Sequence, residues 1–135
     1  ARDAVGTASG YAPLMRFDPA QPYVQGLAGT RHGPLAARVG QPLEIPVYVN
    51  SGETKYERPE SWLYWMLYSG PGDVLFSDDE VQIALTNKEG MGTTSATFSE
   101  PGSYVLLVQS IETLRNSFEY HCCWTNGWVE VTVTN

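Results

Sequence analysis

The fold is decided by a stretch in the second half of the chain, residues 94–108, with the sequence TSATFSEPGSYVLLV. Apolar residues recur at every second position on both sides of Pro101-Gly102, which places them on one face of a pleated strand. Because Pro-Gly favours a turn, this stretch predicts two strands, 93–99 and 103–111, that form a hairpin. The alternation returns in the last strand, residues 128–134, WVEVTVT.

The same signals predict further strands on either side of this hairpin. Pro46 has no N–H to donate to a ladder, so an edge or a bulge is expected at that point. The charged segment 50–61 and residues 112–119 are expected to be loops. Further strands are predicted at residues 35–39, 43–49, 62–68, 74–76 and 81–85, with turns at Gly70-Pro71-Gly72, at 87–92 and at 124–127.

The strand at residues 62–68, WLYWMLY, is apolar throughout instead of alternating. This composition is typical of a strand that is covered on both faces. We expect Trp65 to lie in the core together with Leu63 and Leu67. The residues between them then point outward and need a cover, from the N-terminal residues or from a partner: Trp62, Tyr64, Met66 and Tyr68.

These motifs resemble the polycystic-kidney-disease-type immunoglobulin-like domains of bacterial exported proteins. The resemblance covers residues 42–135 and rests on the Gly-Pro-Gly turn, the stretch 94–108 and the last strand. It implies an immunoglobulin-like sandwich that serves as an adhesion, spacer or docking module. It also implies that Tyr104 is a corner tyrosine, whose hydroxyl bonds nearby backbone.

The composition agrees with a single all-β domain. The chain has 135 residues, of which 17% are charged, and contains 13 Gly and 9 Pro. This length is sufficient for a core without disulfides or metals. The predicted fold class is therefore all-β, an immunoglobulin-like β-sandwich of seven to nine strands with an extended irregular N-terminal arm, divided into an arm (1–33) and a sandwich (34–135).

The arm has no sustained period of 2 or 3.6, and Gly and Pro recur too often for a helix. It nevertheless contains apolar anchors. The arm either packs along its own sandwich or lies on another protein. Ordering about thirty residues costs about 1–2 kcal/mol each in backbone entropy, more than a few buried side chains return, so we expect the arm to contact other subunits. The predicted partner-binding residues are Tyr11, Leu14, Met15, Phe17, Tyr23 and Leu27 of the arm, with Trp62 and Tyr64.

The segment His121-Cys122-Cys123 is the most unusual in the chain. Adjacent cysteines can close a strained vicinal disulfide, remain as two buried thiols, or bridge to another molecule. A metal site of the cupredoxin type would use His121 and the cysteines. Such a copper site needs two His, one Cys and usually a Met, but the only other histidine is His32, in the arm, and no His or Met follows Cys123.

The remaining polar residues give no catalytic signature. No Ser occupies a nucleophile-elbow motif, and we expect neither an enzyme nor a cofactor. The acidic run Asp78-Asp79-Glu80 offers oxygen ligands for calcium, although such a run is more often only solvated. The net charge of −7 argues against nucleic acid, which requires clustered Lys and Arg. No apolar run approaches the roughly 20 residues of a membrane helix, so no direct membrane span is expected.

The first residue, Ala1, is common on the mature side of a signal-peptidase cut, and with the family resemblance it predicts an exported, periplasmic or extracellular protein. The predicted function is that of a non-enzymatic accessory subunit in a larger assembly of protein subunits, one that is potentially membrane-bound. The alternative is a small-ligand or metal-binding module that uses His121, Cys122 and Cys123.

Overall fold

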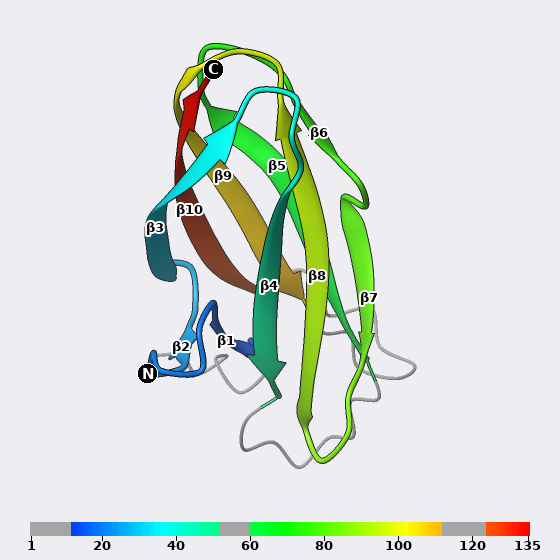
Figure 1. The fold of residues 1–135 in the computed structure, drawn as a ribbon. Coiled ribbons are helices and arrows are strands. Elements are labelled where there is room, and N and C mark those ends of the chain that lie inside the picture. The colour runs from blue at the N-terminus through cyan, green and yellow to red at the C-terminus, as the bar shows by residue number, and fades with distance from the viewer. Residues whose placement is uncertain (1–11, 52–59, 112–123) are drawn as a thin grey trace.

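The computed structural model describes residues 12–51, 60–111 and 124–135. Ten β-strands in these ranges form two five-stranded sheets stacked face to face (Figure 1). This arrangement confirms the predicted all-β sandwich. The β4 sheet has the order β2 (Val24–Gln25), β1 (Leu14–Arg16), β4 (Leu43–Asn50), β8 (Glu89–Phe98) and β6 (Val74–Phe76). The β9 sheet has the order β3 (Thr30–Arg38), β10 (Trp124–Thr134), β9 (Gly102–Ile111), β5 (Glu60–Ser69) and β7 (Glu80–Ala84).

The core lies between the two sheets and is filled by the alternate residues that the sequence predicts. Trp65 is 5% exposed and its ring lies 5.8 Å from that of Phe76, so its predicted core position is confirmed. The prediction for Leu67 is wrong, since this side chain is 38% exposed. The cause is an irregularity in the pairing of β5 with β9 between Leu67 and Ser69, which ends the alternation.

The connection from β8 to β9 crosses from one sheet to the other, so the predicted hairpin is wrong. β8 pairs with β4 and β6, whereas β9 pairs with β10 and β5. Phe98 and Tyr104 therefore enter the core from opposite layers, and their ring centroids lie 4.8 Å apart. Tyr104 Oη donates a hydrogen bond of 2.7 Å to the carbonyl oxygen of Glu100, which confirms the corner tyrosine.

The segment between β6 and β7 also changes sheets. Ser77 N donates to the Ser95 carbonyl at 2.8 Å, and Ser95 N donates back to Ser77 Oγ at 2.9 Å. On the other side, Trp65 N donates to the Asp79 carbonyl at 2.9 Å. The range 77–79 thus bonds to β8 of one sheet and to β5 of the other, and it closes this side of the sandwich.

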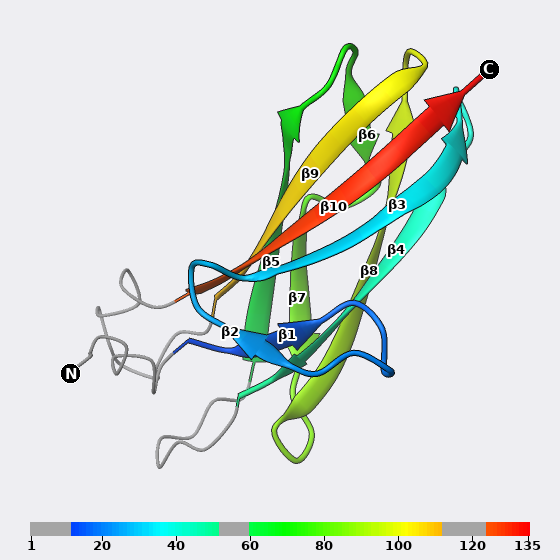
Figure 2. The same ribbon diagram turned by 90° about the vertical axis from the view of Figure 1, so that its left-hand side faces the viewer.

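The described part of residues 1–33 joins the sheets, contrary to the prediction of an arm outside them. β1 pairs with β4, and β3 runs parallel to β10, so the predicted boundary at residue 34 falls inside β3. Figure 2 shows β1 and β2 lying together at one end of the sandwich. Met15 and Phe17 are buried in the core, where a Cβ on Gly127 would meet both side chains. Anchors spaced by two residues at 15 and 17 are a strand signal too short to recognise among the surrounding prolines and glycines.

Three other local predictions can be compared with the strands. β1 pairs with β4 only at residues 48–50, so at Pro46 β4 is paired on the β8 side only, and the predicted edge is confirmed. The predicted turn 87–92 is too long, because Asn87 and Lys88 have positive φ and form a two-residue turn from which β8 starts. Gly90 and Gly92 belong to β8, where Ile83 occupies the space of their missing side chains. The predicted turn 124–127 is also wrong, because β10 already begins at Trp124.

Candidate interaction surface

One face of the β9 sheet points away from the core and is unusually apolar. Strand periodicity places the residues between the core positions on this face, and strand register aligns them in rows. When one face of a sheet is in contact with water, the residues at these positions are normally polar. We call this surface the aromatic face, and it consists of Trp62, Tyr64, Met66 and Tyr68 from β5, Leu107 and Ile111 from β9, Trp124 and Trp128 from β10, and Arg31 from β3.

The central row runs across four strands. Met66 pairs with Leu107, Leu107 with Trp128, and Trp128 with Arg31. Leu107 is only 8% exposed although it points away from the core. The Arg31 guanidinium lies over the Trp128 ring, 5.6 Å from the centroid, and its Nη1 lies 4.0 Å from Glu130 Oε2. The apolar row thus ends in one cation at the β3 edge of the sheet.

The aromatic rings on this face contact one another. Tyr68 meets Trp128 edge to face at 4.8 Å, and Trp62 stacks on Tyr64 at 6.2 Å with an interplanar angle of 15°. Tyr68 is nevertheless 63% exposed and Met66 37%. The rings of this face thus pack on one another, while Met66 and Tyr68 stay open to solvent.

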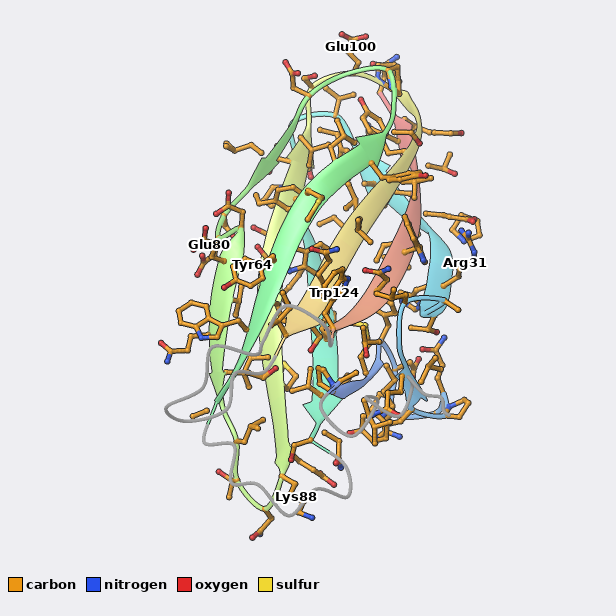
Figure 3. All side chains as sticks on the ribbon, turned by 180° about the vertical axis from the view of Figure 1, so that it is seen from behind. Arg31, Tyr64, Glu80, Lys88, Glu100 and Trp124 are labelled. Carbon is orange, nitrogen blue, oxygen red and sulfur yellow. The ribbon has the colours of Figure 1, made fainter. Side chains whose placement is uncertain are left out.

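The row beside it is polar. Glu80 pairs with Tyr64, Tyr64 with Gln109, and Gln109 with Asn126. Gln109 Nε2 donates to Asn126 Oδ1 at 3.3 Å, and Asn126 Nδ2 donates to the Leu27 carbonyl at 2.8 Å. Figure 3 shows Tyr64 and Glu80 side by side, with Arg31 at the opposite edge of the same sheet. Burial raises the pKa of the Tyr64 hydroxyl, and the Glu80 carboxylate raises it further.

The predicted partner-binding residues fall into several groups. Trp62 and Tyr64 lie together on the aromatic face. Met15 and Phe17 are buried by their own domain, so they cannot be the contact residues that the sequence suggested. Leu14 is half-buried, as is Tyr23, whose ring lies 4.1 Å from the Arg16 guanidinium, while Leu27 is 57% exposed. The described residues do not include the other predicted positions, which are Tyr11, His121, and Cys122 and Cys123 with their predicted vicinal disulfide.

The sequence prediction missed Trp128, Leu107 and Arg31 as members of this surface. Trp128 does alternate with the core residues Val129 and Val131, so its outward direction could have been inferred from its own strand. The register that aligns it with Met66 could not, because that pairing joins residues far apart in the chain.

The described residues do not gather potential metal ligands at one place. Within residues 12–51, 60–111 and 124–135, no group of three His, Cys, Asp or Glu side chains is placed to hold a metal ion. Asp78 Oδ1 instead accepts a hydrogen bond of 3.3 Å from Glu80 N, and the His32 ring stacks on Phe17 at 5.1 Å. A groove of about 380 Å³ beside β6 is mainly apolar, with Val39, Leu75 and Phe98 in its lining. No helix in these ranges is long and apolar enough to span a membrane.

No protein-family model matches the sequence, and no curated protein sequence matches it. Among solved structures, the PapD-like domain 7 (ASH domain) of human CEP192 is similar, at 10% identity over 92% of this chain and 87% of that chain, with a TM-score of 0.49. Domains 4 and 5 of the S-layer protein SbsC show 12% identity over 91% of this chain, with a TM-score of 0.46, and this chain spans about half (54%) of that length. WR4, a C. elegans MSP family member, shows 6% identity over 73% of this chain and 91% of that chain, with a TM-score of 0.45. At such identities the likeness concerns the fold alone.

Proposed function

We propose that the chain is a non-enzymatic interaction protein that docks on a protein partner through the aromatic face. The observation that supports this function is the apolar outer side of the β9 sheet, with Met66 and Tyr68 exposed beside Leu107 and Trp128. Contiguous exposed apolar patches on a folded domain mark interaction sites. Aromatic residues, Met and Arg are also the types enriched at protein interfaces.

The chemistry of the face favours a protein over other ligands. Its rings come from neighbouring strands of one sheet and contact one another, edge to face for Tyr68 and Trp128 and stacked for Trp62 and Tyr64. Small molecules prefer concave sites, whereas flat apolar surfaces with a polar rim suit another protein. The net charge of −7, with Arg31 the one basic residue in the central row, opposes binding of a nucleic acid backbone.

A more specific form of the proposal places the chain as an exported accessory subunit of a larger assembly. Its support is the resemblance of residues 42–135 to immunoglobulin-like domains of the polycystic-kidney-disease type, through the stretch 94–108 and its corner tyrosine, Tyr104. In this form Leu27, exposed between β2 and β3, adds a second contact beside the aromatic face. Fractionation of the source cells tests this form, because recovery of the chain only with the cytoplasm contradicts export.

Site-specific photo-crosslinking in the native cells tests the docking surface. A photoreactive side chain replaces Met66 or Tyr68 on the aromatic face, or Leu75 or Met91 as controls on the β4 sheet, which are 73% and 51% exposed. We expect a discrete protein adduct from positions 66 and 68 and none from positions 75 and 91. Equal adducts from all four positions, or adducts from the control positions only, contradict docking through the aromatic face.

A further inference from the structure

We infer that the partner seated on the aromatic face is a second copy of this chain, in a two-fold dimer whose axis runs along β9. This inference rests on the proposed function, since it names the occupant of the same surface. It follows from the strand order β3-β10-β9-β5-β7, in which β9 is the middle strand. A two-fold axis along β9, in the plane between two facing sheets, brings β10 over the partner's β5 and β3 over the partner's β7.

The charges at the two edges of the sheet are opposite, which fits this symmetry. Arg31 on β3 has a side chain 66% exposed, and Glu80 on β7 is exposed at the other edge. Among the described residues, no Lys or Arg forms an ion pair with the Glu80 carboxylate. Arg31 lies in the row that passes through Leu107, and Glu80 lies in the row that passes through Gln109. These two rows are about 7 Å apart along β9, a distance that the Arg side chain can span. The two-fold axis therefore places each Arg31 near the partner's Glu80, twice in one interface.

The centre of the face is also self-complementary. The same axis brings Trp128 of one copy over the β5 residues Met66 and Tyr68 of the other. A thioether against an indole is a favourable contact, and the exposed ring of Tyr68 gains a cover. Leu107 lies on the axis itself, and its side chain is already covered, at 8% exposed.

The outer side of the whole β9 sheet, from Arg31 on β3 to Glu80 on β7, is large enough for a weak dimer. Five strands at about 4.8 Å spacing give a width of about 24 Å, and three rows of outward residues a height of about 20 Å. Two such faces bury about 1,000 Å² in total, which is the lower limit for a specific interface. We therefore expect dissociation at micromolar concentrations, not an obligate dimer.

The test is sedimentation velocity on the purified full chain, over a range of concentrations up to about 100 µM. Wild type is expected to move from monomer to dimer over this range. Arg31→Glu and Glu80→Arg each place like charges opposite one another and are expected to weaken dimerisation about tenfold or more, while the double swap restores it. Lys88→Glu and Glu100→Arg are the matched controls, because they make the same changes in net charge at the two ends of the sandwich, far from the face (Figure 3).

Each outcome decides the inference. A wild-type chain that stays monomeric overturns it, as does a dimer in which Arg31→Glu and Glu80→Arg behave like Lys88→Glu and Glu100→Arg. Circular dichroism confirms that each variant is folded, and rescue by the double swap excludes a folding defect as the cause. If the dimer fails while positions 66 and 68 still crosslink to a different protein in cells, docking through the aromatic face stands and only the identity of the partner is wrong.

Discussion

Tyr104 performs two tasks with one side chain at the point where the chain passes between sheets. Its ring is 1% exposed and packs on Phe98, while its hydroxyl reaches back to the carbonyl oxygen of Glu100. Gly70 must lack a side chain here, because a Cβ would lie 2.3 Å from the Tyr104 ring. The ring thus fixes the β5–β6 turn and the β8–β9 corner together.

Tyr104→Phe separates these two tasks, since it keeps the ring and removes the hydroxyl. We expect the free energy of unfolding in urea to fall by about 1–2 kcal/mol, because a partly buried hydrogen bond is lost while the packing of the ring remains. Tyr68→Phe is the matched control and is expected to change it by less than about 0.5 kcal/mol, since Tyr68 is 63% exposed. Equal effects of the two changes contradict a structural role for the Tyr104 hydroxyl.

Tyr64 predicts a pH dependence at the aromatic face. Burial and, second, the Glu80 carboxylate raise its pKa above the ordinary value of 10.0. The folded chain then holds the phenol proton more tightly than the unfolded chain, so this contribution to stability is complete below pH 10.0 and is lost as the pH rises through the folded pKa. Tyr64→Phe is therefore expected to lose less stability than wild type when urea unfolding is compared below and above this pH. Parallel losses in both proteins contradict it.

The strands show which parts of this fold the sequence can predict. Trp65, Tyr104 and Pro46 were placed correctly, because each depends on the periodicity or chemistry of its own strand. The hairpin at residues 94–108 was wrong because alternation defines two strands without specifying which sheet each one joins. Likewise Trp62 and Tyr64 were recognised as outward-facing, whereas the aromatic face also needs the register of β9 and β10.

Among the connections between strands, Thr94 of β8 binds the segment that passes from one sheet to the other between β6 and β7. This side chain is 2% exposed, donates to the Asp78 carbonyl at 2.6 Å, and accepts from Asp78 N at 3.2 Å. Thr94→Val keeps the shape and leaves both backbone groups of Asp78 without this partner. We expect a loss of about 1–3 kcal/mol in the free energy of unfolding.

Thr97→Val is the matched control for this change, because Thr97 lies on the same strand, half-buried on the opposite face. It is expected to change the free energy of unfolding by less than about 0.5 kcal/mol. If the two substitutions have the same effect, the bonds of Thr94 to Asp78 do not hold the crossing segment.

At the scale of the whole molecule, the N-terminal segment ties the two sheets together. β1 belongs to the β4 sheet, yet Met15 and Phe17 pack against Gly127 of β10 in the other sheet. Thr125 Oγ1 accepts from Gly26 N at 2.9 Å and donates to the Pro13 carbonyl. Backbone pairing and a share of the common core therefore both stabilise the described part of this segment and offset its backbone entropy.

The division into an arm (1–33) and a sandwich (34–135) can be tested by truncation to residues 34–135. This change removes β1, β2 and the start of β3, and with them Met15 and Phe17 from the core. Each large core side chain is worth about 2–5 kcal/mol, against a total stability of about 5–15 kcal/mol for a typical domain, so we expect the shortened chain to show no cooperative unfolding transition.

Phe17→Ala in the full chain is expected to cost about 3–5 kcal/mol in the free energy of unfolding. Leu27→Ala, at an exposed site in the same segment, is expected to be nearly neutral. A truncated chain that unfolds at the same urea concentration as the full chain would show that residues 34–135 form an independent sandwich, and that the N-terminal segment is an accessory to the fold after all.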